Sequence, residues 1–495
     1  LFHRTRANQL LCTGGKMRHS LFCFFVTIFL VFAVSCKSDG KYEMEKGTLW
    51  GAKTNSKIEG FSGKGYVEFS SYIDGNSKLE VNIEADGEYA VKVNFCNPAK
   101  KTWSGVRVDY DGGKYLCSQR LPVSETFTSV YINNPVNFTK GTHEITVARV
   151  NEGWLLDSIE IVPLTEEIKN LITPSNKLAI KNPSKKTQAL FDYLLSQRGK
   201  SILSGQYIYS DMNDINVIEE VTGKYPAIMG IDLIDYSPSR VEHGTRGTVI
   251  RKAKAWAKKN GIITCSWHWN APKDLIDEDR PEMRWYDGFR AKATTFNYVK
   301  GLQDKNSEEY ALMIRDIDVI AEQLKSLMDS DIPVLWRPLH EAAGGWFWWG
   351  ARGAENYIEL YKLMFDRLVN YHGLNNLIWV WNGQNSDWYP GDEYVDIVAY
   401  DTYPGKQTYV TSHKELQIVQ SASEKPKLCA LSENGTLPDI EALANENSLW
   451  GFFCTWNGEF VLKGDSYSSE YTEESVLKKY YANDFVITRD ELPKF

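Results

Sequence analysis

Two glutamates, Glu341 and Glu433, stand directly after apolar runs that predict buried strands. Residues 332–336 are followed by Arg337, His340 and Glu341, and residues 427–432 are followed by Glu433. Two carboxylates that share one cleft can divide the work of catalysis, because one can hold a proton while the other stays ionised. The two residues are far apart along the chain. This chemistry therefore depends on a fold that brings two strand ends together.

The composition indicates which reaction such a pair would serve. The chain has 16 Trp and 27 Tyr, and flat rings stack on sugar rings and on bases alike. A net charge of −8, with no cluster of Lys and Arg, argues against a nucleic-acid partner and favours a neutral sugar. Glycoside hydrolysis needs one carboxylic acid to release an alkoxide and one carboxylate to meet the oxocarbenium-like carbon.

Metal-dependent and serine-dependent chemistry fit the sequence less well. The run from His340 to Ala343 begins like the zinc motif HExxH, but its fifth position is Gly344, so the second histidine is missing. No CxxC pair indicates a zinc ribbon, and no GxSxG motif follows a strand-like run. We therefore expect catalysis without a cofactor.

The second part of the chain predicts a (β/α)8 TIM barrel, because eight strand-like runs alternate with helical patterns. A doubly wound sheet would need a Gly-rich phosphate turn after its first strand, and Ser204-Gly205-Gln206 is no such turn. The strand-like runs are residues 201–204, 227–232, 262–267, 333–338, 377–381, 396–400, 427–432 and 450–456.

In such a barrel the catalytic residues lie at the C-terminal strand ends. Glu341 would follow strand 4 and Glu433 strand 7. Strands 4 and 7 are three apart around a ring of eight, so the two side chains can converge on one bound group.

The region before the predicted barrel has a different pattern of polar and apolar residues. Residues 42–163 contain short runs of alternating polar and apolar residues, broken by Gly, Asn and Asp every 8–12 residues. This pattern predicts an antiparallel β-sandwich, jelly-roll-like, as a separate domain. Residues 164–187 are rich in polar residues and predict a linker, and residues 188–495 form the predicted barrel domain.

The first residues predict export and not part of the fold. Met17 is a plausible start, with residues 1–16 upstream of it, and residues 21–34 are an apolar run suited to a signal peptide. The run ends in Ala33-Val34-Ser35-Cys36, which resembles a bacterial lipobox. We expect cleavage after residue 35, acylation of Cys36 and a tether at residues 36–41, giving an outer-membrane or cell-surface lipoprotein. An ordinary secretion signal, with a periplasmic or extracellular product, is the alternative.

The chain has 8 Cys, but few suit a disulfide framework. Cys265, Cys429 and Cys454 lie inside apolar strand-like runs and are expected to be buried thiols. Cys96 and Cys117 share the first domain, and the sequence leaves open whether they pair or stay as thiols.

Several motifs in the barrel region, taken in order, resemble glycoside hydrolase family 26. The resemblance covers residues 186–495 and implies a barrel with the acid/base after strand 4 and the nucleophile after strand 7. Glu341 would then be the acid/base and Glu433 the nucleophile. The motifs are the runs at residues 200–206, Arg337-Pro338-Leu339-His340-Glu341, Trp346, residues 377–382, Asp401-Thr402-Tyr403 and Leu431-Ser432-Glu433-Asn434.

The same resemblance implies a set of substrate-site residues. Tyr403 would hydrogen-bond the nucleophile, and Arg337 would keep it ionised and placed. His340 holds a position where most of the related barrels carry Asn, and Asn434 departs from the small residue usual after the nucleophile. The full implied set is His268, Arg337, His340, Trp346, Asp401, Tyr403 and Trp456.

The sandwich region resembles carbohydrate-binding module family 35, through residues 42–45, 60–67 and 154–160. The resemblance implies a structural Ca²⁺ held by Glu43, Glu45 and Asp157, whose hard carboxylate oxygens suit this ion. It implies glycan contact at loop aromatics, for which Trp103 and Trp154 are the candidates. A stabilising sandwich that binds no sugar is the alternative.

Together these features predict a retaining endo-β-1,4-mannanase that acts as a monomer on mannan-type polysaccharide or oligosaccharide. A family 26 β-glucanase or β-xylanase would share the same carboxylate pair and is the nearest alternative. A non-catalytic glycan-binding surface protein is the alternative from another class, but such a protein has no use for two opposed carboxylates.

Overall fold

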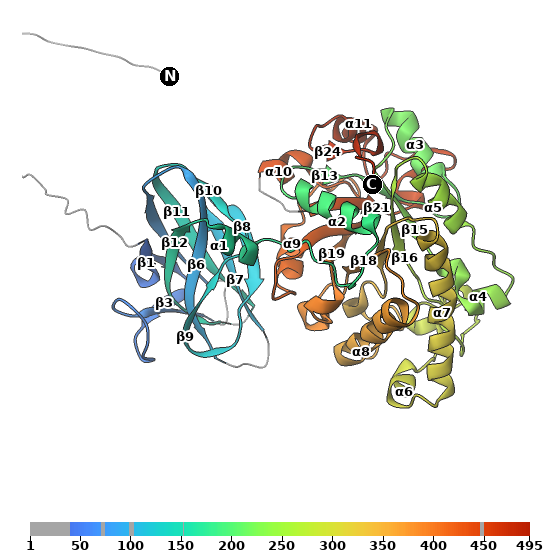
Figure 1. Cartoon of the computed structure of the whole chain (residues 1–495), viewed down its shortest axis with the longest axis horizontal. Helices are drawn as coiled ribbons and strands as arrows, with labels where there is room; N and C mark the ends of the chain where they lie inside the picture. Colours follow the sequence, from blue (N-terminus) through green and yellow to red (C-terminus); the bar gives the residue numbers. More distant parts are fainter. Residues whose placement is uncertain (1–39, 71–74, 99–102, 152, 446–449) are drawn as a thin grey trace, which may run out of the picture. The chain divides into compact units, whose positions relative to one another are not determined.

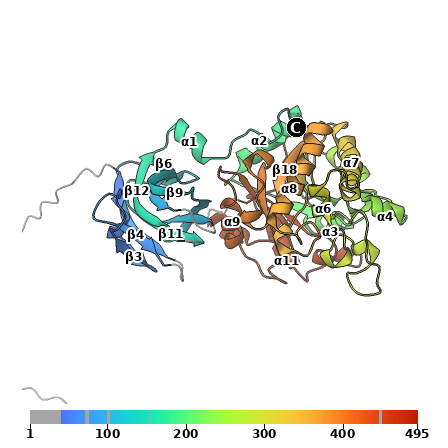
Figure 2. The ribbon, with the colours of Figure 1, turned by 90° about the horizontal axis from the view of Figure 1, so that it is seen from below.

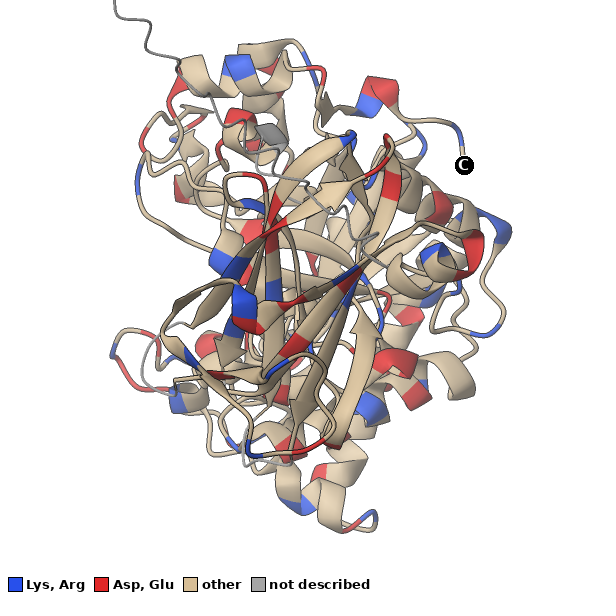
Figure 3. Ribbon diagram, turned by 90° about the vertical axis from the view of Figure 1, so that its left-hand side faces the viewer, with Lys and Arg blue, Asp and Glu red and all other residues tan. Residues whose placement is uncertain are grey.

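The structure is a computed structural model, and it describes residues 40–70, 75–98, 103–151, 153–445 and 450–495. The predicted signal run, the cleavage site and Cys36 lie outside the described residues. Within the described ranges, no helix has both the length and the apolar character that a membrane crossing requires. Lys and Arg are interspersed with Asp and Glu over the ribbon in view (Figure 3).

Residues 41–163 form two antiparallel sheets, which confirms the predicted β-sandwich (Figures 1 and 2). One sheet has the order β10-β6-β12-β4-β3, with β1 paired to β12 and β9 paired to β6; the other has the order β2-β5-β11-β7-β8. Their bounds are β1 Lys41–Glu43, β2 Thr48–Trp50, β3 Ala52–Asn55, β4 Tyr66–Phe69, β5 Asn76–Ile83, β6 Gly87–Asn97, β7 Ser104–Tyr110, β8 Lys114–Arg120, β9 Ser124–Tyr131, β10 Val136–Phe138, β11 Gly141–Asn151 and β12 Leu155–Pro163.

The sandwich core follows from the period-two pattern of the strands. On β6, Val91, Val93 and Phe95 are buried while the residues between them are partly exposed, and Ile145 and Val147 do the same on β11. Alternate residues of a strand point to opposite faces, so these side chains meet between the two sheets. Burial of this apolar area holds the two sheets together.

The second part of the described chain is a closed parallel barrel, as predicted. Neighbouring strands pair in parallel from first to last, and Gln206 pairs with Thr455 to close the ring. The eight strands are β14 Gly205–Tyr207, β15 Ile228–Asp232, β16 Ile262–Ser266, β17 Val334–Arg337, β18 Leu377–Trp381, β19 Ile397–Thr402, β20 Leu428–Asn434 and β21 Trp450–Thr455.

Helices surround the barrel strands (Figure 1). The longest, α7, begins after Ser307, whose hydroxyl accepts from the backbone N–H of Tyr310, and it buries a stripe that includes Ile317 and Leu324. The helices of this part are α2 Lys185–Gln197, α3 Asn213–Thr222, α4 Pro238–Glu242, α5 Val249–Ala257, α6 Tyr298–Gln303, α7 Glu308–Met328, α8 Ala354–Phe365, α9 His413–Gln420, α10 Ile440–Asn445 and α11 Glu474–Tyr481.

The first barrel strand lies later than predicted. The sequence placed it at residues 201–204, but the barrel strand is β14, and the preceding β13 (Ile202–Leu203) pairs with β24 (Val486–Ile487) as well as with β21. The chain changes partner at Ser204, which bonds the carbonyl of Ile487 through both its backbone N–H and its hydroxyl. A Cβ on Gly205 would lie 2.5 Å from the carbonyl oxygen of Phe453, so glycine allows this close entry into the ring.

The predicted linker at residues 164–187 is not structureless. It contains α1, Glu166–Ile172, and its last residues begin α2. Thr165 caps α1 by accepting from the backbone N–H of Ile168, and Glu166 and Glu167 lie in the first turn, where acidic side chains complement the helix dipole. Local capping therefore forms a short helix where composition alone predicted a coil.

Candidate active site

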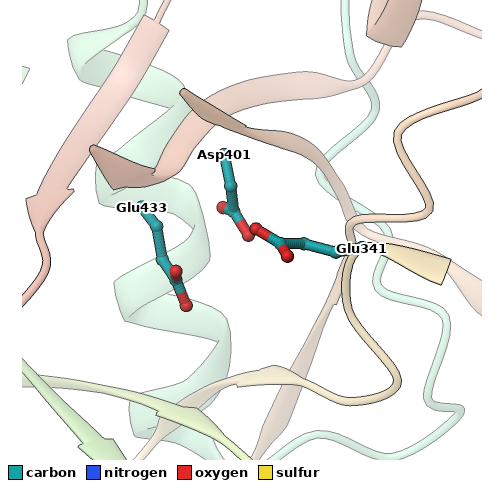
Figure 4. Close-up of side chains that lie close together, drawn as sticks. All are labelled: Glu341, Asp401 and Glu433. Carbon is teal, nitrogen blue, oxygen red and sulfur yellow. The ribbon is translucent and has the colours of Figure 1, made fainter. Parts of the chain in front are cut away.

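Glu341 and Glu433 meet at the mouth of the barrel, just past β17 and at the end of β20 respectively. One carboxylate oxygen from each lies within 4.8 Å of the other and of an oxygen of Asp401 (Figure 4). Retaining glycosidases place their two carboxyl groups about 5–5.5 Å apart, whereas inverting enzymes need about 6.5–9.5 Å to admit a water. The close approach suits direct attack by one carboxylate on the anomeric carbon.

Glu433 is held from both of its oxygens. Its Oε1 is paired with the guanidinium of Arg337, and its Oε2 accepts from the hydroxyl of Tyr403 at 2.6 Å. Only 4% of the residue is exposed. A carboxylate fixed in this way cannot turn away from the substrate, and both partners stabilise its ionised form.

Arg337 is itself held below the cleft. It donates to Asp401 Oδ2 at 2.9 Å, and Asp401 Oδ1 accepts from Asn382 at 2.9 Å and from Ser432 at 2.7 Å. The side chains of Arg337 and Asp401 have no exposed surface. Both were predicted in the substrate-site set, but neither side chain has surface to offer a substrate: Arg337 pairs with Glu433, and Asp401 pairs with Arg337.

Three members of this buried network are missing from the predicted set. Tyr207, whose hydroxyl lies 3.3 Å from Arg337, ends β14, while Asn382 directly follows β18 and Ser432 precedes Glu433 on β20. Their positions at C-terminal strand ends are the signal that could have found them. The sequence does not reveal which neighbour each side chain contacts.

Glu341 lies in a strained turn on the opposite side. Its φ is 52°, in the left-handed region, and its backbone N–H donates to the carbonyl of Asn382 at 2.7 Å. The indole N–H of Trp346 donates to Glu341 Oε2 at 2.8 Å. Strained backbone of this kind persists only where the surroundings hold it, and it often marks a functional residue.

The surroundings shift the pKa values of Glu341 and Glu433 by different amounts. Burial raises the pKa of Glu341 far above its usual value, and the negative charges of Asp401 and Glu433 raise it further. Burial also raises the pKa of Glu433, but the positive charge of Arg337 opposes this. Because the two groups are coupled, the order of the two pKa values is what matters: Glu433 gives up its proton first and Glu341 keeps its own.

Aromatic rings and histidines form the walls around the pair. Trp346 is 45% exposed, while Trp456 is partly exposed and packs on Tyr207 with ring centroids 4.7 Å apart. His268 is partly buried beside Trp456, and His340 is almost fully buried. Of the predicted substrate-site residues, Trp346, Trp456, Tyr403 and His268 therefore have surface to offer a sugar, and His340 does not.

Asn434, the departure from the usual motif, points into the protein. Its amide donates to the hydroxyl of Thr455 at 3.0 Å and to the carbonyl of Thr436 at 3.2 Å, and the residue is fully buried. Its role is therefore to join β20 to β21 beneath the mouth of the barrel.

The three acidic side chains at the mouth could in principle hold a cation. One oxygen each from Glu341, Asp401 and Glu433 is close enough to share an ion. The guanidinium of Arg337, however, already pairs with both Asp401 and Glu433. A cation would compete with this fixed positive charge, so the donor set does not fit a metal and suits proton transfer instead.

The predicted metal residues of the sandwich also come together. Ser62 donates its hydroxyl to Glu43 at 2.8 Å and its backbone N–H to Asp157 at 2.8 Å, and the backbone N–H of Lys64 donates to Glu45 at 3.2 Å. Glu45 Oε2 is buried and has no hydrogen-bond partner within the described residues. Such an oxygen suits a hard cation. The three carboxylates do not, however, form a group with oxygens all within 4.8 Å of one another, a spacing that only the barrel triad reaches among the described residues.

The two predicted glycan-contacting tryptophans of the sandwich differ. Trp154 is 1% exposed, packs against Phe69 and Phe95, and donates its indole N–H to the carbonyl of Gly105. It belongs to the sandwich core, so its prediction as a glycan-stacking residue is wrong. Trp103 is partly exposed and stays a candidate.

Each of the two domains matches the model of a known protein family. Residues 180–491 match the model described as glycosyl hydrolase family 26, and residues 40–164 match carbohydrate binding module (family 35). The chain belongs to glycosyl hydrolase family 26. The two matches meet close to the boundary between the sandwich and the barrel, and they confirm both resemblances seen in the motifs.

Relatives of this family 26 chain match it over most of its length. A mannan endo-1,4-beta-mannosidase of Thermothelomyces thermophilus is 38% identical over 455 residues, or 91% of this chain and 90% of the relative. Mannan endo-1,4-beta-mannosidase B of Piromyces sp. is 33% identical, covering 96% of this chain and 80% of the relative.

A solved structure of a Podospora anserina β-(1,4)-mannanase, which joins a family 26 domain to a family 35 module, is 34% identical. The match has a TM-score of 0.59 and covers 91% of this family 26 chain and 98% of that one.

Proposed function

We propose that the chain is a retaining endo-β-1,4-mannanase that hydrolyses mannan, galactomannan or glucomannan. The observation that carries this proposal is the close pair formed by Glu341 and Glu433, with Arg337 bound to only one of them. The relatives named above, which match over most of this chain, are mannan endo-1,4-beta-mannosidases and support the same substrate.

In the first step, Glu433 attacks the anomeric carbon while the bond to the leaving sugar breaks. Glu341 gives its proton to the glycosidic oxygen, so the leaving sugar departs as a neutral alcohol. The product is a glycosyl ester on Glu433. The ion pair with Arg337 and the Tyr403 hydrogen bond keep the attacking carboxylate in place until the bond forms.

In the second step, Glu341 acts as a base. Esterification removes the negative charge of Glu433, which is one of the charges that raise the pKa of Glu341. The pKa of Glu341 therefore falls after the first step, and the residue is ionised when a water approaches the anomeric carbon. It takes the proton of that water, the carbon–oxygen bond to Glu433 breaks, and both carboxyl groups return to their starting states.

A product profile on four polysaccharides tests the substrate. We expect oligosaccharides from mannan and glucomannan and little turnover of mixed-linkage glucan or xylan, with Glu433→Gln protein as the blank. A β-glucanase or β-xylanase of the same family would instead turn over mixed-linkage glucan or xylan and leave mannan intact. A non-catalytic binder would release nothing from any of them.

We also propose that the sandwich holds one structural Ca²⁺ through Glu43, Glu45 and Asp157. The unpartnered oxygen of Glu45 supports this. So does Gly63, which has a φ of +70°, and a Cβ there would lie 2.7 Å from Glu45 Oε1, so only glycine leaves the carboxylates room to converge. The module would bind glycan through the partly exposed Trp103.

For location, we propose a lipoprotein anchored at Cys36 after removal of residues 1–35. The apolar run at residues 21–34 and its Ala-Val-Ser-Cys ending support this. Cys36→Ala should release the protein from the membrane fraction into the soluble fraction. Unchanged fractionation of that variant would contradict the anchor.

A further inference from the structure

Asp232, at the end of β15, lies beside the active-site histidine His268, with 13% of its side chain exposed. Its Oδ2 lies 2.5 Å from Nδ1 of His268, and its Oδ1 accepts from the backbone N–H of His268 at 3.0 Å and of Ile234 at 2.9 Å. Burial raises the pKa of Asp232, but hydrogen bonds from the side chain and backbone of His268 and from the backbone of Ile234 oppose it, and that pKa lies below its usual value. The carboxylate is therefore ionised, and it requires a proton on Nδ1 of His268.

The other ring nitrogen of His268 faces a second histidine. Its Nε2 lies 3.1 Å from Nε2 of His340, and a hydrogen bond between two such nitrogens needs one proton, not two or none. With one proton held on Nδ1 by Asp232, a His268 ring without a second proton presents a lone pair at Nε2. His340 must then donate from its own Nε2.

The opposite arrangement is disfavoured by the surroundings of His340. It would leave a proton on Nδ1 of His340, which is buried without a hydrogen-bond partner among the described residues. It would also put a positive charge on the pair. Burial, then the positive charge of Arg337, lowers the pKa of His340 well below its usual value, so His340 carries a single ring proton. The charged groups that face this pair are Asp232, Arg337 and Glu433, and Asp232 is the one that touches His268.

The His340 ring matters because His340 lies within the turn that carries the acid/base. Leu339 has a φ of 50° and Glu341 a φ of 52°, so non-glycine residues on both sides of His340 are in the left-handed region. The backbone of this turn is held by Trp349, whose indole N–H donates to the carbonyl of His340 at 2.9 Å. The imidazole of His340 is held by His268.

We propose that Asp232 is a positioning residue for the acid/base Glu341. By fixing the tautomer of His268, Asp232 makes His340 a hydrogen-bond donor and so holds the strained turn from Leu339 to Glu341. This inference rests on the proposed retaining mechanism, in which Glu341 protonates the leaving group.

The Asp232→Asn variant tests it, because the amide has the same shape and no charge. An amide N–H facing Nδ1 of His268 would move the ring proton to Nε2, where it would meet the N–H of His340. Loss of the carboxylate that orients a metal-ligating histidine typically costs about 10–100-fold, and we take the same range for His268. We expect that loss in kcat/KM on mannopentaose.

The choice of leaving group separates this role from general damage. On a 2,4-dinitrophenyl β-mannobioside the leaving group needs no proton, so kcat/KM of Asp232→Asn should fall by less than about threefold. Asp235→Asn is the matched control, because Asp235 is a neighbouring carboxylate that pairs with Arg240 away from the histidines. Equal losses of Asp232→Asn on both substrates would overturn the proposal.

A spectroscopic measurement tests the tautomers without activity. Long-range imidazole ¹⁵N NMR of histidine-labelled protein should show His268 protonated on Nδ1 and His340 on Nε2, with His268→Gln and His340→Gln assigning the signals. Asp232→Asn should reverse the tautomer of His268. Wild-type His268 protonated on Nε2 would overturn the proposal even if the enzyme is active. Wild-type protein with the expected tautomers but no turnover of mannan would refute the proposed function and leave the tautomer chain standing.

A double variant tests whether Asp232 acts through His268. Asp232→Asn should cause no further loss of kcat/KM on mannopentaose in a His268→Gln background. A further loss as large as that of the single variant would show that Asp232 acts by another route. Thermal unfolding of each variant shows that the compared proteins are folded.

Discussion

The barrel and the sandwich both carry acidic residues and tryptophans that the sequence singled out, but they place them differently. At the mouth of the barrel, Glu341, Glu433 and Trp346 lie at or just after strand ends and point into one site. In the sandwich, Trp154 stands just before β12 and turns into the core. A parallel barrel fixes where a strand-end side chain points, whereas the start of a sandwich strand leaves both faces open.

The largest expected loss of activity is that of a Glu433 variant, because Glu433 is the proposed nucleophile at the mouth of the barrel. Glu433→Ala removes a carboxylate that contacts both Arg337 and Tyr403, as no other does in the described parts of the chain, so it should abolish hydrolysis of every substrate, activated or not. Steady-state rates on mannan and on dinitrophenyl glycosides measure this. Glu424→Ala is the control. Glu424 is exposed in the loop that precedes β20, so this variant should keep full activity. Residual turnover by Glu433→Ala on activated substrates would reassign the nucleophile.

A smaller and more selective loss is expected for Glu341→Ala. Its first step should survive when the leaving group is dinitrophenolate, because that group needs no proton. The second step lacks its base, a loss of roughly 10²–10⁴, so the glycosyl-enzyme should accumulate. Azide needs no base and should restore turnover, giving a β-glycosyl azide. An α-azide, or β-azide rescue of Glu433→Ala instead, would reverse the two assignments.

Substitution of the two tryptophans of the sandwich, Trp154 and Trp103, tests their different placement. Trp154→Ala empties a core position and should destabilise the sandwich by about 3–5 kcal/mol. Trp103→Ala should leave stability nearly unchanged and weaken retention on insoluble mannan. Thermal unfolding and a pull-down on mannan measure the two effects. If Trp154→Ala lost only binding, with the same melting temperature, its placement in the core would be contradicted.

The smallest expected effect is that of calcium removal. A chelator should lower the melting temperature of the sandwich, because an ion that binds the folded state stabilises it by mass action. Turnover of short soluble oligosaccharides by the barrel should stay the same. Glu45→Gln should abolish the sensitivity to chelator. Loss of that turnover on chelation would instead reveal a metal in catalysis.

The catalytic pair could be predicted from the sequence because both residues follow strand ends. The burial of Arg337 and Asp401, which hold Glu433 in place, could not. Apolar runs place Glu341 and Glu433 in the ring, since each run must cross the barrel core and end at its mouth. Burial of Arg337 and Asp401 depends on contacts between β17, β19 and the residue that follows β18, which no single run contains. Those contacts are tertiary, and a pattern along the chain does not encode them.

The positions of two secondary-structure elements, the first barrel strand and α1, could not be predicted from the sequence pattern either. The apolar runs predict the barrel strands, but the first is misplaced because the chain changes partner at Ser204 within one continuously buried stretch, residues 201–208. The helix α1 was missed because it has only 7 residues and buries only Ile172, and its N-cap, Thr165, lies within a polar segment. Periodicity finds long elements that bury a face, and it misses bends and short capped turns.

The hydrogen bond from Trp346 to Glu341 has a stereochemical consequence. An indole N–H can only donate, so Glu341 Oε2 can only accept from it. In the protonated acid the carbonyl oxygen is the better acceptor, so this bond favours the hydrogen on Oε1. Trp346 thus favours the oxygen from which the proton leaves, and with it the side from which the glycosidic oxygen would be protonated.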